Sequence, residues 1–104
     1  MRWNITDMIR LLIHAPTPAA LERARRNAAN LVKAEPLATV EIVANAGAVA
    51  AALADPHPTD EHLRLCQNTL TATGGKAPAH IQTVAAAVLH IAQRQADGWA
   101  YMRA

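Results

Sequence analysis

Residues 63–70 read Leu63-Arg64-Leu65-Cys66-Gln67-Asn68-Thr69-Leu70, a stretch that predicts a short strand running directly into a helix. The stretch also carries the only cysteine of the chain. A thiol at such a junction lies where backbone N–H groups and the helix dipole can lower its pKa. The sequence therefore indicates covalent chemistry at this one place.

The same strand-then-helix pattern occurs on both sides of this stretch. An apolar run at 8–14 is followed by Thr17 and Pro18, which suit the N-cap and first position of a helix. Strands are expected at 8–14, 38–45, 63–66, 81–84 and 99–103, and helices at 18–34, 46–53, 67–73 and 85–97. Such alternation is typical of crossover units. We expect a three-layer α/β/α fold with a mostly parallel four- to five-stranded sheet.

Length and composition indicate one domain over residues 1–104 in a reducing compartment. A single cysteine allows no intrachain disulfide, and no apolar run approaches the ~20 residues of a membrane span. The net charge is only +2, the basic residues are scattered, and Phe is absent. We therefore expect a cytoplasmic protein that binds neither nucleic acid nor membrane.

A site in such a sheet is expected at the carboxyl ends of the strands, where the strand order reverses. If the order is 2-1-3-4, as in the flavodoxin-like arrangement, His14 and Cys66 face each other across the crevice. The helix that begins near Gln67 and Asn68 would stabilise a thiolate, and His14 would favour ionisation further. The alternatives are that Cys66 is a small buried apolar residue and that His14 is a hydrogen-bonded residue at a strand end.

The segment Asn45-Ala46-Gly47-Ala48 resembles a short anion cradle at a helix start. A helix cap by Asn45 followed by a tight turn accounts for the same residues. The histidines at 57, 62, 80 and 90 have no spacing that would place a pair on one helix face, so no metal site is expected. Prolines after the first strand argue against a flavin phosphate, and no cofactor is expected.

Three segments resemble those of the DsrE/DsrF-like proteins of intracellular sulfur oxidation and sulfur relay. They are residues 43–49, residues 66–70 and the ending Arg94-Gln95-Ala96-Asp97-Gly98-Trp99-Ala100-Tyr101-Met102-Arg103. The resemblance implies a three-layer fold with a parallel sheet, assembly into trimers or hexamers, and a cysteine that carries sulfur as a persulfide between partner proteins. Cys66 is the only position in this sequence that this cysteine could occupy.

Two functions follow as hypotheses. The first is a sulfur-relay carrier or sulfurtransferase that holds sulfur on Cys66, with His14 assisting, and that exchanges it with donor and acceptor proteins. The second is a non-catalytic oligomer with a structural cysteine and a small anion or ligand bound near Asn45, Gly47, Gln67 and Asn68. A small alanine-rich core and the aromatic residues Trp99 and Tyr101 near an edge strand favour a homo-oligomer in both cases.

Overall fold

Five parallel strands form one sheet in the computed structural model of the chain, which describes residues 9–104. The strands are β1 (Arg10–Ala15), β2 (Thr39–Ala44), β3 (Leu63–Cys66), β4 (Gln82–Val84) and β5 (Ala100–Arg103). The helices are α1 (Pro18–Ala34), α2 (Gly47–Ala54), α3 (Gln67–Thr73) and α4 (Ala87–Ala96), and η2 (Pro58–His62) is a 3-10 helix. The first strand begins at Arg10 rather than at residue 8, and Met8 lies outside the described residues.

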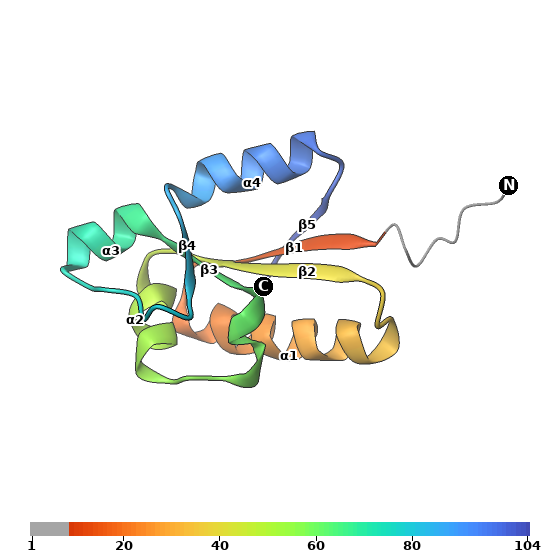
Figure 1. Cartoon of the computed structure of the whole chain (residues 1–104), viewed down its shortest axis with the longest axis horizontal. Helices are drawn as coiled ribbons and strands as arrows, with labels where there is room; N and C mark the ends of the chain where they lie inside the picture. Colours follow the sequence, from red (N-terminus) through yellow and green to blue (C-terminus); the bar gives the residue numbers. More distant parts are fainter. Residues whose placement is uncertain (1–8) are drawn as a thin grey trace, which may run out of the picture.

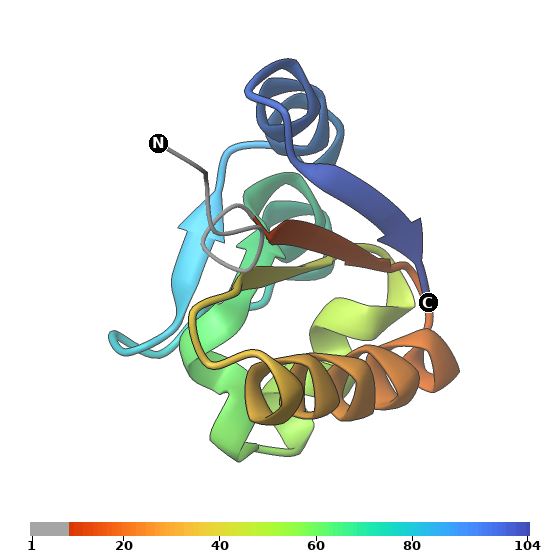
Figure 2. The same cartoon turned by 90° about the vertical axis from the view of Figure 1, so that its right-hand side faces the viewer.

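Helices cover both faces of the sheet. Figures 1 and 2 show α1 and α2 on one side and α4 on the other, while α3 extends past the carboxyl end of β3. Successive side chains of a strand point to opposite faces, so each face has its own core. Ile13, Ile42 and Leu65 pack with α1 and α2, whereas Leu12 and Val43 pack with Cys66 and Ala87 under α4. The predicted α/β class is confirmed.

The start of α1 follows its sequence signals. The Thr17 side chain accepts a hydrogen bond from the Ala20 N–H at 3.0 Å, and Pro18 occupies the first helical position, where a missing N–H costs nothing. Leu21, Ala24 and Ala28 are buried against the sheet. The cap fixes where α1 begins, just past the carboxyl end of β1.

The strand order differs from the expected one. The sheet runs β4-β3-β2-β1-β5, so β2 lies between β1 and β3. Each of the first three crossovers places the next strand on the same side, and the chain returns across the sheet only after β4, to pair β5 with β1. Periodicity identifies strands, but it does not tell on which side a crossover places the next one. The flavodoxin-like order is wrong.

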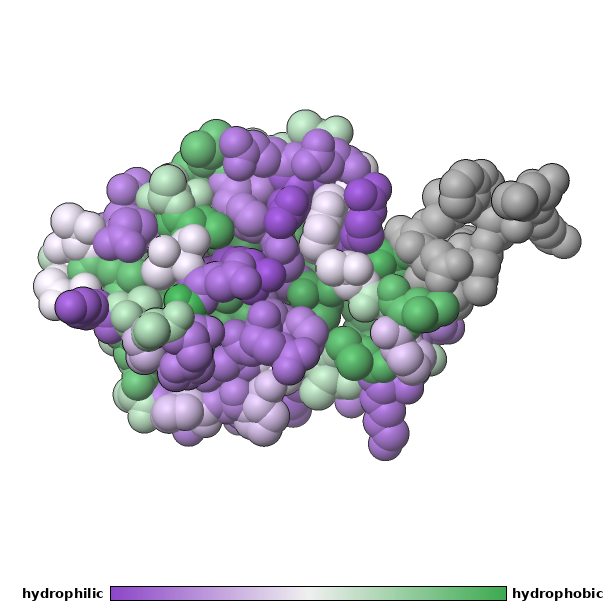
Figure 3. All heavy atoms as spheres, viewed as in Figure 1, coloured by the Kyte–Doolittle hydropathy of each residue, from purple (hydrophilic) through white to green (hydrophobic). Residues whose placement is uncertain are grey.

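The exposed surface is largely polar. Figure 3 shows hydrophilic side chains over most of the visible face, with smaller hydrophobic areas between them. The large apolar side chains that are most exposed are Leu37, Val88, Leu89 and Tyr101. Within residues 9–104, no helix combines the length and the apolar character that crossing a membrane requires.

Candidate functional site

Cys66 is the last residue of β3 and the residue before the first turn of α3, as the sequence predicts. Only 5% of the residue is exposed. Its Sγ accepts a hydrogen bond from the backbone N–H of Ala87 at 3.4 Å. Ala87 is the first residue of α4, so the sulfur lies at the start of two helices, of which the sequence indicated only one.

The surroundings of Cys66 favour its thiolate. Burial raises the pKa of the thiol, but hydrogen bonds from the backbone N–H groups of Thr69, Ala87 and Asn68 and from the Thr69 hydroxyl lower it by more, so the pKa lies below its ordinary value. A thiolate is the nucleophilic form of cysteine. The residue therefore combines burial with a lowered pKa, which an ordinary core cysteine lacks.

A second polar group lies on β1 and β5, at the same edge of the sheet. His14 Nε2 is 2.9 Å from Asn45 Oδ1, and His14 Nδ1 is 3.0 Å from the Tyr101 hydroxyl. Because an amide oxygen only accepts, Nε2 donates to Asn45, and Nδ1 of the neutral ring accepts from Tyr101. Tyr101, Asn45 and His14 thus form one hydrogen-bonded chain that holds the imidazole in a single orientation.

Thr69 connects this group with Cys66. The Ala46 N–H donates to Thr69 Oγ1 at 3.1 Å, and the same threonine lowers the pKa of Cys66. Asn45 and Ala46 are consecutive in the loop between β2 and α2. The contacts therefore run along the carboxyl edge of the sheet from β5 to β3.

His14 and Cys66 do not face each other on neighbouring strands, contrary to the expectation. Strand β2 separates β1 from β3, and a spacing of about 4.8 Å between adjacent strands places them about 10 Å apart. Cys66 instead pairs in register with Val84 of β4. The strands advance across the sheet from β1 to β4, and the chain then crosses back to β5. Cys66 therefore still lies next to the strand at which this direction reverses, whereas His14 lies on β1, two strands away from β3.

Asn45 does not cap α2. The N-cap position is Ala46, which has no side chain to accept a hydrogen bond, and the Asn45 amide contacts His14 instead. Ala46 has φ 49° and ψ −135°, which is rare for a residue with a Cβ. The tight turn lets the loop reach Thr69 while Asn45 stays beside β1.

The other predicted ligand-binding residues have structural contacts. A Cβ on Gly47 would be 3.4 Å from Pro18 Cδ, so the glycine packs against the start of α1. The Gln67 amide donates to the Thr71 hydroxyl one turn along α3. Asn68 contributes a backbone N–H beside Cys66. These contacts leave the ligand-binding roles as predictions.

Three features were missed at the sequence level. Tyr101 was expected only as an edge aromatic residue and Thr69 as an ordinary helical residue, whereas both join the polar edge. The third is Glu41, a buried carboxylate in β2 whose oxygens contact three cationic or ionisable side chains. These are Arg94 at 2.8 and 3.0 Å, His90 at 2.7 Å and Arg64 at 3.5 Å. An acidic residue inside a strand that is covered on both faces is a sequence signal for such a partner set.

Glu41 fastens α4 to the sheet. Burial raises its pKa, but the hydrogen bonds from Arg94 and His90 and the charges of Arg64 and Arg94 lower it by more, so the carboxylate is ionised at neutral pH. Arg94 also lies over the Trp99 ring, 4.8 Å from its centroid. Ala87 of the same helix touches the thiol, so α4 contacts both Glu41 and Cys66.

A metal centre is not indicated by the geometry. Among residues 9–104, no three His, Cys, Asp or Glu side chains gather closely enough to hold a metal ion. The polar edge is built from one thiol, hydroxyls, an amide and an imidazole. It offers one buried thiol together with hydrogen-bond donors and acceptors.

Comparison with known proteins supports the fold alone. The solved structure of a protein of unknown function, MTH1491 from Methanobacterium thermoautotrophicum, matches with a TM-score of 0.68 and 24% sequence identity. The match covers 92% of this chain and 99% of that one. No family model and no curated protein matches the chain. The site must therefore be interpreted from its own residues.

Proposed function

We propose that this protein is a sulfur carrier of the DsrE/DsrF-like kind, which holds sulfane sulfur as a persulfide on Cys66. The observation that supports this most is the position of Sγ, which accepts the Ala87 N–H and has a lowered pKa at the carboxyl edge of the sheet. A structural cysteine needs neither feature. The three segments that resemble this family include Cys66 and the loop at 43–49.

The transfer needs no metal or redox partner. The Cys66 thiolate attacks the terminal sulfur of a donor persulfide, R–S–SH; the donor S–S bond breaks, R–S⁻ leaves, and a new S–S bond forms on Cys66. An acceptor thiolate then attacks the terminal sulfur of this persulfide. The S–S bond to Cys66 breaks, and Cys66 leaves as a thiolate. A low pKa makes Cys66 a better leaving group in this second step.

His14 serves as a positioning residue in this proposal. Both of its ring nitrogens are already hydrogen-bonded, and its strand lies about 10 Å from β3. It holds Asn45, and the adjoining Ala46 N–H holds the Thr69 hydroxyl beside the thiol. Replacing His14 would therefore act on Cys66 through the loop.

Access to the thiol requires movement of α4, because Cys66 is 5% exposed. Ala87, the helix residue that touches Sγ, is also the one buried residue of α4. A helix with so little buried surface can separate from the sheet more easily than α1 can. A donor or acceptor protein would bind at this edge and reach the thiol when α4 opens.

The test is intact-mass measurement after incubation with a small-molecule persulfide donor. We expect one added sulfur atom on the wild-type chain, none on Cys66→Ser, and release of the sulfur by an added thiol. Thr71→Val, an exposed change on the same helix, should load like the wild type. An unmodified wild-type chain, or equal loading of Cys66→Ser, would rule out the carrier function.

Assembly and location are part of the same proposal. A cytoplasmic trimer or hexamer would cover the edge strand β5 and the exposed apolar residues Val88 and Leu89 of α4. The partners would be the proteins that donate and accept the sulfur.

The alternative, a small anion held by residues 45–48, is less well supported. The Ala46 N–H donates to Thr69, and the Ala48 and Val49 N–H groups donate to backbone oxygens of this same loop. The Asn45 side chain is bound to His14. N–H groups that already donate to acceptors within the chain have few hydrogen bonds left to offer an anion. Melting temperatures that rise with phosphate or sulfate, and lose that rise in Asn45→Ala, would revive this alternative.

A further inference from the structure

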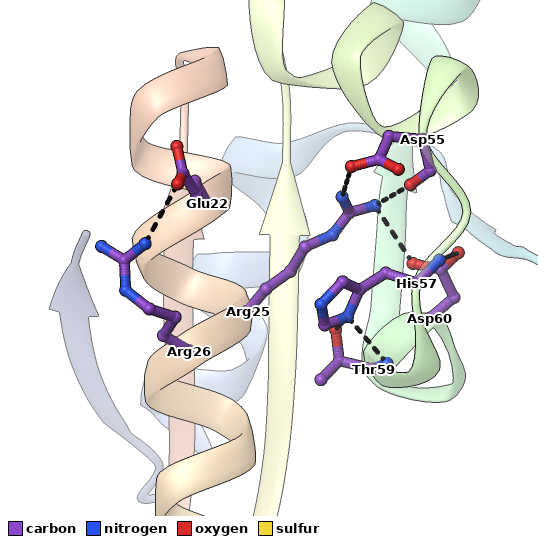
Figure 4. Close-up of polar contacts among 7 residues, drawn as sticks. All are labelled: Glu22, Arg25, Arg26, Asp55, His57, Thr59 and Asp60. Carbon is purple, nitrogen blue, oxygen red and sulfur yellow. Dashed lines mark hydrogen bonds and ion pairs between the residues drawn. The ribbon is translucent and has the colours of Figure 1, made fainter.

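A hollow of about 510 Å³ lies between α1 and the segment that joins α2 to η2. It is on the face of the sheet opposite Cys66, so the proposed sulfur chemistry does not use it. The apolar lining is formed by Pro18, Leu21 and Ala51. The polar lining is formed by Arg25, Asp55 and His57 together with the ion pair of Glu22 and Arg26, all drawn in Figure 4. Its volume is that of a small-molecule site.

Arg25 gives the polar lining a buried charge. The residue is 5% exposed, and its Nη2 donates to the Asp55 carbonyl at 2.8 Å and to Asp60 Oδ1 at 3.3 Å. Its Nε is the one buried side-chain nitrogen or oxygen in residues 9–104 that lacks a hydrogen-bond partner. A buried donor without an acceptor is costly, so the acceptors within the described part of the chain do not fully satisfy this guanidinium.

His57 supplies a second donor. Its Nδ1 accepts from the Thr59 N–H at 3.2 Å and lies 2.8 Å from the Thr59 hydroxyl. The His57 side chain thereby caps η2. The neutral ring therefore carries its proton on Nε2. No acceptor among residues 9–104 takes that proton. His57 and Arg25 both line the hollow, and Figure 4 shows the imidazole held by Thr59.

Charge decides which kind of ligand fits. The charged residues that line the hollow are two cations, Arg25 and Arg26, and two anions, Glu22 and Asp55, so the lining has no net charge. A ligand that carries both a positive and a negative group matches such a lining better than a simple anion does. The Asp55 side chain is 79% exposed and touches Arg25 only through a long 3.4 Å contact, so its carboxylate can bind a cation as well.

We propose that the hollow binds a free α-amino acid with an apolar side chain. The ligand ammonium pairs with Asp55, and the ligand carboxylate accepts from His57 Nε2 and faces Arg25. Both groups are on one carbon of an amino acid, which matches a lining with charges of both signs. The side chain then lies over Leu21 and Ala51.

The probes are L-leucine, N-acetyl-L-leucine and L-leucinamide, titrated into the full chain by calorimetry and amide NMR. The acetyl derivative lacks the ammonium, and leucinamide lacks the carboxylate. We expect leucine to bind, and each derivative to bind at least about tenfold more weakly, since each loses one charge-assisted contact. NMR shifts should centre on residues 18–26 and 51–57.

Two variants test the assigned contacts. Asp55→Asn should weaken the binding of leucine about tenfold. It should leave the binding of N-acetyl-leucine unchanged, because that derivative has no ammonium group to pair with Asp55. His57→Asn removes the Nε2 donor, yet an asparagine can still cap η2. It should weaken leucine and leave the weak binding of leucinamide unchanged. Asp97→Asn, the same change at the end of α4, is the matched control and should bind like the wild type.

Three outcomes would overturn the proposal. They are no binding of leucine at millimolar concentration, binding of N-acetyl-leucine or leucinamide as tight as that of leucine, and shifts that lie outside the hollow. Melting curves of both variants should match the wild type, so that a lost contact is not confused with lost folding. None of these readouts depends on Cys66.

Discussion

The thiol of Cys66 is buried and yet more acidic than an ordinary cysteine, because N–H and O–H donors surround the sulfur. Rates of iodoacetamide labelling against pH follow the ionisation of this thiol together with the opening of α4. We expect the wild-type inflection below the ordinary thiol value and a higher one in Thr69→Val, which loses the hydroxyl. Thr69→Ser keeps the hydroxyl and should titrate like the wild type. Identical profiles for all three would contradict the role of Thr69.

The same pKa also predicts how stability depends on pH. The folded-state pKa of Cys66 is below the unfolded one, so the contribution of this group is fully present above the unfolded value. The contribution is lost as pH falls through the folded pKa. Urea unfolding at a series of pH values should show stability rising between the two pKa values. Cys66→Ser should lack that rise; an equal rise in this variant would refute the prediction.

Ala46 carries backbone strain in the loop that reaches Thr69. Its φ of 49° with ψ of −135° suits glycine, and such a conformation costs an alanine about 1–3 kcal/mol. Part of the gain from a glycine is offset by about 0.5–1 kcal/mol of lost freedom on folding. We therefore expect Ala46→Gly to raise the free energy of unfolding by about 1 kcal/mol. Ala29→Gly, at an exposed position of α1, should instead lower the free energy of unfolding. A destabilised Ala46→Gly chain would show that the turn is not strained.

At the scale of elements, α4 depends on one carboxylate. Glu41→Gln keeps the shape but leaves Arg64 and Arg94 without a counter-charge, and breaking a buried ion pair costs about 3–5 kcal/mol. We expect about 3 kcal/mol, since a third of the Arg94 side chain is exposed and can be solvated. Cys66 labelling at constant pH should be faster in the same variant, because α4 opens more often.

Hydrogen exchange separates local opening from global unfolding. Faster exchange confined to residues 87–96 in Glu41→Gln would show that α4 opens by itself. Glu61→Gln changes an exposed carboxylate and should leave both labelling and exchange unchanged. If Glu41→Gln labels no faster than the wild type, the ion cluster does not control access to the thiol.

The elements themselves could largely be predicted, because local signals specify them. The bounds of β3 and α3 agree with the prediction at 63–66 and 67–73, and Thr17 caps α1 as expected. Contacts between distant segments could not be predicted. The pairing of His14 with Tyr101 spans 87 residues and depends on β5 lying beside β1, which no local pattern determines. The Asn45 prediction was wrong about the cap for the same reason.

At the scale of the molecule, the strand order determines which polar side chains can lie next to each other. With β2 between β1 and β3, the imidazole and the thiol are connected through the loop at 45–46 and not by direct contact. The order also places β5 at an edge, and Figure 2 shows α4 on the side of the sheet opposite α1 and α2. The two faces of the sheet are thus covered by different helices.

This arrangement leads to a prediction about assembly. Val88 is 77% exposed and Leu89 is 50% exposed on α4, the helix that precedes the edge strand β5. A second copy that packs against this helix and strand would bury both residues and the open edge of β5. Light scattering should then give a mass well above the 11.1 kDa of one chain. The double change Val88→Glu and Leu89→Glu should return the protein to a monomer, because charges at a buried interface are not tolerated.

The control is Ala29→Glu with Asn30→Asp, which adds the same charge at two exposed positions of α1 and should leave the mass unchanged. A wild-type monomer at micromolar concentration would exclude the assembly, and with it the expectation that a neighbouring subunit covers β5.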